Sequence, residues 1–121
     1  MTNTAKLLYQ FVSKFGLPAY VEGYVPDDAK LPYITYTLVE PDWREQVSFT
    51  MRVWYKSTSY SEINAKIDEI SKTIGEGICV PNSDGYIIIY KDAMFSQFQP
   101  YDNDSNVKVA YLSMILNALT N

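Results

Sequence analysis

A chain of 121 residues is long enough for one folded domain that buries roughly two thirds of the surface of its unfolded chain. Hydrophobic residues make up 47% and charged residues 20%, which excludes the composition of disordered chains. The net charge is -4, and no run of lysine and arginine residues is present to bind phosphate groups. We therefore expect neither direct nucleic-acid binding nor docking on an anionic membrane.

The N-terminal part predicts a helix followed by two strands. Apolar residues recur at helical spacing from Thr4 to Phe15, with Thr4 available as the N-cap and Gly16 just past the end. Residues 19–25 and 33–39 are rich in tyrosine and β-branched residues, and a polar loop separates them. We therefore expect each of the two segments to form a strand.

The middle of the chain predicts a long strand and a second helix. A turn at 40–45 leads into a segment with a strict period of two, in which one face carries Val47, Phe49, Met51, Val53 and Tyr55. After Ser59 or Ser61 as N-cap, one helical stripe carries Ile63, Ile67, Ile70 and Ile74. We expect this helix to cover the sheet.

The C-terminal part predicts further strands. Residues 78–80 and 86–90 flank a turn and are expected to pair as a hairpin, and 95–99 form another strand. Residues 107–116 are predicted as the last strand. Because their final positions are apolar on both faces, a helix is the alternative there.

These elements predict a single domain over residues 1–121, without a linker or an internal repeat. The expected class is α+β. The domain has two layers, a mostly antiparallel sheet covered by two helices, in the order α-β-β-β-α-β-β-β.

The chemical inventory is narrow, because histidine is absent and Cys79 is the single cysteine. This excludes Ser–His and Cys–His nucleophile pairs as well as histidine-containing and all-thiolate metal sites. Cys79 lies between apolar residues and is expected to be buried. Asp102 and Asp104 begin like a calcium loop, but the glycine position holds Val107 and the glutamate position holds Ser113. We therefore expect no metal and no cofactor.

Three carboxylates in one turn, Glu40, Asp42 and Glu45, are the remaining candidates for acid–base catalysis. Their position in a polar turn indicates a water-exposed cluster whose members all stay ionised. The sequence also lacks the G-x-S-x-G motif of serine hydrolases. We expect that the protein is not an enzyme.

The aromatic residues are more informative, since tyrosine occurs 11 times and aromatics reach 15% of the chain. Tyrosine and tryptophan combine apolar area with a polar tip, which suits protein interfaces. The candidate interface residues combine a tryptophan with neighbouring charges and are Trp43, Arg44, Arg52, Trp54 and Lys56. The alternative for Trp54 is that a helix covers its face of the strand.

Two segments carry a family resemblance: 31–36, with the sequence LPYITY, and 53–58, with the sequence VWYKST, which the second helix follows at once. Here the chain resembles the tail-terminator or tail-completion proteins of long-tailed bacteriophages, and its order of elements resembles theirs over nearly its whole length. One departure is the turn at 40–45, which is shorter than the loop that such proteins often have there.

The resemblance implies a structural protein without an active site. It implies a homo-oligomeric, hexameric ring that caps the tail tube and joins it to the head connector, so the tube protein and the connector are the expected partners. The expected location is the virion, at the head–tail interface, after assembly from the host cytoplasm. A head-completion or minor capsid protein is the nearest alternative, and a ferredoxin-like enzyme or small-ligand module is the alternative from another class.

Overall fold

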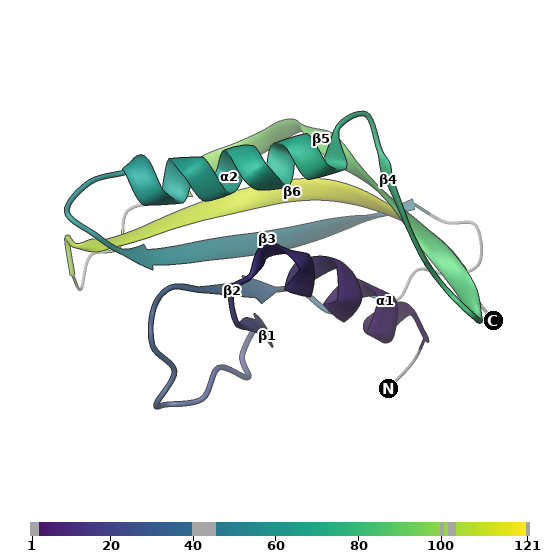
Figure 1. The fold of residues 1–121 in the computed structure, drawn as a ribbon, viewed down its shortest axis with the longest axis horizontal. Coiled ribbons are helices and arrows are strands. Elements are labelled where there is room, and N and C mark those ends of the chain that lie inside the picture. Colours follow the sequence, from purple (N-terminus) through teal and green to yellow (C-terminus); the bar gives the residue numbers. More distant parts are fainter. Residues whose placement is uncertain (1–2, 40–45, 100, 102–103, 121) are drawn as a thin grey trace.

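The computed structural model describes residues 3–39, 46–99, 101 and 104–120. Trp43, Arg44 and the rest of the turn at 40–45 lie outside the described residues. The elements in chain order are α1 (Asn3–Val12), the 3-10 helix η1 (Ser13–Phe15), β1 (Ala19–Val21), β2 (Tyr33–Tyr36), β3 (Gln46–Lys56), α2 (Ser61–Ile74), β4 (Ile78–Asn82), β5 (Gly85–Gln99) and β6 (Val107–Thr120) (Figure 1).

The described strands form one six-stranded sheet in the order β1-β2-β3-β6-β5-β4. The longest pairing joins β3 to β6, which run antiparallel from Gln46↔Asn117 to Lys56↔Val107. The edge strand β1 runs parallel to β2, whereas the other neighbours are antiparallel. The sheet is therefore mixed.

The predicted fold class, a two-layer α+β domain with a mostly antiparallel sheet covered by two helices, is wrong. The structure consists mainly of one curled, mixed six-stranded sheet, with α1 and α2 on its inner side (Figure 1). The sequence pattern suggested antiparallel neighbours, whereas residues 22–32 are enough chain to return β2 beside β1 in the same direction. The order of elements resembles the predicted one, with η1 added.

The sheet curls around α1. At one edge of the sheet, Gln10 Nε2 of α1 donates to the Pro81 carbonyl of β4 over 3.1 Å. In the other half of the sheet, the Phe11 ring packs edge-to-face on Phe49 of β3, with 6.5 Å between the centroids. Strands have an intrinsic right-handed twist, which accumulates along strands as long as β5 and β6. The sheet is therefore curved enough for α1 to contact both of its halves.

The core lies between the helices and the inner face of the sheet. The inward side of β3 is confirmed, because Phe49, Met51 and Val53 are fully buried and Tyr55 is nearly so. The isoleucine stripe of α2 is confirmed as well, with every member buried: Ile63, Ile67, Ile70 and Ile74. Within the described chain, no helix combines the length and the apolar character needed to cross a membrane.

Two local predictions in the C-terminal half need correction. The segment 95–99 is not a separate strand, because β5 continues through an irregularity between Lys91 and Ser96. Cys79 is exposed rather than buried, because β4 is an edge strand and Cys79 faces away from the core between inward-facing neighbours. The last segment is a strand through Thr120, which excludes the helical alternative.

Candidate functional site

The outer face of the sheet, opposite the helices, carries a row of aromatic side chains. Tyr20 comes from β1, Tyr33 from β2 and Trp54 from β3, and Tyr101 follows β5. The ring centroids lie 5.7 Å apart for Tyr20 and Tyr33, 5.9 Å for Tyr33 and Trp54, and 5.9 Å for Trp54 and Tyr101. We call these four residues the aromatic row. Its members hold one another by edge-to-face and tilted ring contacts.

Strand register explains why these residues meet. The period of two turns Trp54 outward because Val53 and Tyr55 point into the core. Tyr33 is the direct cross-strand partner of Trp54 in β2. In an antiparallel pair such partners share a face and lie side by side, so the Tyr33–Trp54 contact follows from the backbone pairing.

A polar network supports the row from beneath. The Trp54 indole Nε1 donates to Thr35 Oγ1 over 3.0 Å, and the Thr35 hydroxyl donates to Glu22 Oε1 over 2.7 Å. Arg52 Nε lies 3.6 Å from the same Glu22 oxygen, and the Arg52 guanidinium lies over the Tyr111 ring at 4.3 Å. Thr35 is only 1% exposed. The tryptophan orientation is therefore fixed by a buried hydroxyl whose own proton is already used.

The surroundings of Tyr33 in the row favour its neutral phenol. Burial raises the pKa of the Tyr33 hydroxyl above its ordinary value, and repulsion from Tyr101, Glu22 and Tyr20 raises it further. Tyr33 consequently remains a hydrogen-bond donor at neutral pH.

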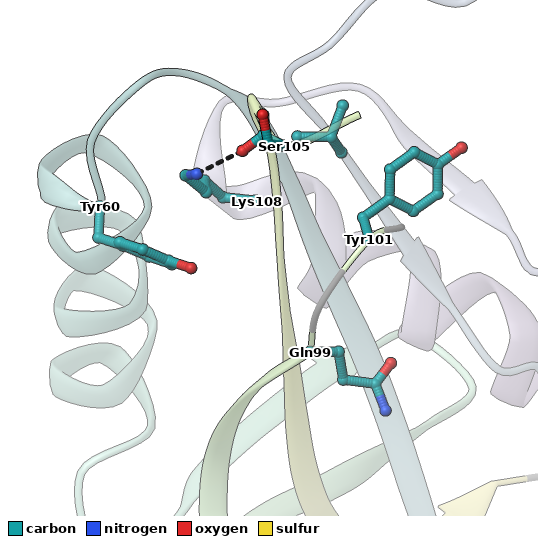
Figure 2. Close-up of a pocket in the computed structure, with 6 residues that line it drawn as sticks. Tyr60, Gln99, Tyr101, Ser105 and Lys108 are labelled. Carbon is teal, nitrogen blue, oxygen red and sulfur yellow. Dashed lines mark hydrogen bonds between the residues drawn. The ribbon is translucent and has the colours of Figure 1, made fainter. Parts of the chain in front are cut away.

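A small pocket opens at the Tyr101 end of the row. It encloses about 220 Å³ and is lined by Tyr60, Gln99, Tyr101, Ser105, Val107 and Lys108. Figure 2 shows Tyr60 and Tyr101 on opposite sides of the Lys108–Ser105 pair. Lys108 Nζ donates to the Ser105 carbonyl over 2.6 Å and lies 4.9 Å from the Tyr60 ring centroid. We call this the Lys108 pocket.

A second concavity, which we call the tyrosine groove, lies at the Tyr20 end of the row, beside the edge strand β1. It measures about 390 Å³ and is lined mainly by apolar surface from Tyr9, Ala19, Tyr20, Val21, Tyr24, Tyr36 and Leu38. Tyr24 is 79% exposed and Leu38 is 51% exposed. Exposed apolar side chains gathered in one place are typical of interaction surfaces.

The structure brings part of the predicted interface together. Arg52 and Trp54 lie on the same outer face and share the Thr35–Glu22 network, whereas Lys56 is exposed at the end of β3. The alternative that a helix covers Trp54 is wrong, because α1 and α2 pack on the opposite face. No structural account applies to Trp43 and Arg44, which are outside the described residues.

Sequence reasoning missed the partners that surround Trp54. Tyr20, Tyr33 and Tyr101 come from three separate segments, and only the sheet register makes them neighbours. The available signal was the tyrosine count of 11, which indicates an aromatic surface without locating it.

Asp104, in the segment that begins like a calcium loop, has a local structural role. Asp104 Oδ1 accepts from the Asn106 backbone N–H over 2.9 Å, which is an ordinary turn contact. Within the described residues, no group of three or more Cys, Asp or Glu side chains is placed to hold a metal ion.

Comparison with known proteins adds no assignment, since no family model and no curated protein sequence matches this chain. The function is therefore inferred from the physical character of the surface. A rigid row of aromatic rings with an arginine beside it is suited to binding other proteins, because such residues carry most of the binding energy in protein interfaces.

Proposed function

We propose that this protein is a non-catalytic virion assembly protein that works by binding other proteins. Specifically, it is a subunit of the ring that caps the tail tube of a long-tailed bacteriophage and joins the tube to the head connector. The observation that carries the proposal is the aromatic row, which lies on the helix-free face and runs between the Lys108 pocket and the tyrosine groove.

Preorganisation makes the row suitable for binding. Ordering a flexible side chain in an interface costs about 0.5–1.5 kcal/mol. The Trp54 ring is already ordered by Thr35 and by two neighbouring rings in the folded protein. Binding of a partner therefore loses little further side-chain entropy at this residue. Tryptophan and arginine are also the side chains most enriched at the energetic centres of interfaces, which fits the pair Trp54 and Arg52.

Two unlike sheet edges suit the lateral contacts of a ring. On one side, the outermost strand is β1, which is only three residues long. On the other side, β4 pairs with β5 only as far as Ile89, so in the described chain no strand lies beyond the rest of β5. Met94 in that open part is 68% exposed. A head-to-tail ring needs two different patches on each subunit, and open strand edges readily pair.

The proposal separates two kinds of contact. The sheet edges join neighbouring copies, and the aromatic row contacts the tube or the connector. The protein is released into the host cytoplasm and acts in the virion, at the head–tail interface.

The proposal can be tested with purified tail-tube protein encoded in the same genome. We expect tubes polymerised in the presence of this protein to be shorter and to carry a ring at one end in negative-stain electron microscopy. Met94→Lys should weaken the ring, whereas Lys72→Ser, on the exposed side of α2, should leave capping unchanged. Tubes that grow to the same length and show no bound protein would contradict the tail-terminator function.

A further inference from the structure

We infer that the Lys108 pocket binds the carboxylate of an acidic side chain supplied by a protein partner. The inference rests on the proposed protein-binding function of the outer face and adds the chemistry of one contact. Tyr101 links the two sites, because it lines the pocket and its ring packs on Trp54 at 5.9 Å. Lys108 is the cross-strand partner of the inward-facing Tyr55, so its side chain lies on the helix side of the sheet. A partner on the aromatic row reaches it around the end of the sheet, past Tyr101.

The charge in the pocket comes from Lys108. Its ammonium group is positioned by the Ser105 carbonyl, 2.6 Å away, and by the face of the Tyr60 ring. An ammonium has three donors, and a hydrogen bond to one carbonyl leaves donors available for a ligand. Lys108 forms no ion pair within the described part of the chain, where the ion pairs are Arg52–Glu22 and Lys66–Glu69.

Among the described residues, no carboxylate forms an ion pair with Lys108. None of the six described residues that line the pocket is acidic. Asp104 is close in sequence, but its carboxylate accepts the Asn106 N–H and so serves its own turn. The described lining also carries the hydroxyls of Tyr60, Tyr101 and Ser105 and the amide of Gln99. In Figure 2 the Tyr101 hydroxyl and the Gln99 amide point away from Lys108, so the ammonium is the group that would bind a carboxylate directly.

The same features favour a carboxylate over a phosphate group. Phosphate groups in proteins are typically bound by a bidentate arginine, and the described lining of the pocket contains none. Tyr60, which lines the pocket, is the N-cap of α2, and a helix N-terminus stabilises an anion of either kind. A single lysine matches the single charge of a carboxylate. The net charge of -4 also opposes the approach of a polyanion such as nucleic acid.

The walls of the pocket favour a carboxylate carried by a polypeptide. Tyr60 packs on Phe98 with 4.8 Å between the ring centroids, and Phe98 is 43% exposed. With Tyr101 opposite, aromatic surface borders the charged centre on both sides. A peptide places apolar atoms next to its acidic side chain, whereas a free acid such as acetate has little to place there.

The test is an NMR titration of the ¹⁵N-labelled protein with capped tripeptides. The probe is acetyl-Ala-Glu-Ala-amide, and the matched control ligand is the same peptide with glutamine. We expect the glutamate peptide to shift the backbone amide signals of Ser105, Val107 and Lys108. It should bind about tenfold or more tightly than the glutamine peptide, which cannot form the charge-assisted hydrogen bond.

Two variants separate the pocket from general charge effects. Lys108→Met keeps the length of the side chain and removes its charge, so glutamate-peptide binding should weaken by about tenfold. Lys91→Met is the matched control, because Lys91 also lies over an aromatic ring, that of Phe95 at 5.5 Å, but outside the pocket. Its binding of the peptide should equal that of the parent.

Several results would overturn the inference. Equal binding of the glutamate and glutamine peptides would show that charge is not recognised. Tighter binding of inorganic phosphate would indicate a phosphate site, and acetate binding as tightly as the peptide would indicate a site for free acids. Tube capping by the parent together with no peptide response would leave the proposed function standing and reject the pocket assignment alone.

Discussion

The Trp54 indole donates its N–H to the buried hydroxyl of Thr35, 3.0 Å away, across the β2–β3 pair. The same hydroxyl donates to Glu22, so one small side chain positions both a large ring and a carboxylate. The orientation of Trp54 in the aromatic row therefore depends on this atom.

Thr35→Val is therefore expected to cost about 1–3 kcal/mol in the free energy of unfolding, because it leaves buried polar partners without a hydrogen bond. Trp54 fluorescence should also shift as the ring loses its fixed position. Urea denaturation followed by tryptophan emission measures both effects. Thr73→Val, on the exposed side of α2, should change stability by less than about 0.5 kcal/mol. Equal stability of the two variants would contradict the supporting role of Thr35.

Truncation of the isoleucine stripe should be far more costly. Ile70 is fully buried, and we expect Ile70→Ala to lower the free energy of unfolding by about 2–5 kcal/mol. Ile67 is 8% exposed, so Ile67→Ala should fall at the lower end of that range. Asp68→Ala between them is exposed and serves as the control in chemical denaturation. If Ile70→Ala denatures at the same urea concentration as the parent, α2 does not cover the core.

Gly77 is expected to tolerate no side chain. Its φ is +148°, and an added Cβ would lie 2.7 Å from Cε1 of Tyr90. Gly77→Ala should cost about 1–3 kcal/mol through backbone strain, with the collision adding to it. Combining it with Tyr90→Ser should recover the part due to the collision and leave the part due to φ. Thermal denaturation of the single and double variants distinguishes the two, and a Gly77→Ala protein as stable as the parent would refute both.

Alkaline pH should destabilise the protein through buried phenols. Burial raises the pKa of the Tyr36 and Tyr55 hydroxyls above 10.0, with Tyr9 adding to the first and Glu62 and Glu69 to the second. Because the folded state holds the neutral phenol, the related stability is fully present below the unfolded pKa and is lost as pH rises through the folded pKa. Urea denaturation from pH 8 to about 11 should show this loss, and Tyr55→Phe should reduce it. An unchanged pH profile in that variant would contradict the assignment.

Much of the local structure followed from the sequence, because it depends on periodicity. The alternation through 46–56 gave β3 and its inward face, and the isoleucine spacing gave the buried side of α2. Cys79 shows the limit of such reasoning. Apolar neighbours at 78 and 80 suggested burial, but in an edge strand the alternation turned Cys79 toward solvent.

The architecture and most of the site could not be predicted, because they depend on contacts between distant segments. The parallel pairing of β1 with β2 is set by the return path of residues 22–32, which carries no local signal. Trp54 and Arg52 were identifiable as candidates on one strand. Tyr20 and Tyr101 join Trp54 only after the sheet is assembled, so their role had no signature in the sequence.

The most direct test of the account is hydroxyl-radical footprinting of this protein bound to tail tubes, read out by mass spectrometry. Aromatic side chains are reactive in this assay, so the oxidation of the row residues measures directly how far a partner buries them. We predict that Tyr20, Trp54 and Tyr101 lose reactivity in the complex, while exposed Lys72 of α2 and its neighbours keep theirs. Unchanged reactivity of the row in a protein that is bound to the tube would contradict the claim that this face is the binding surface.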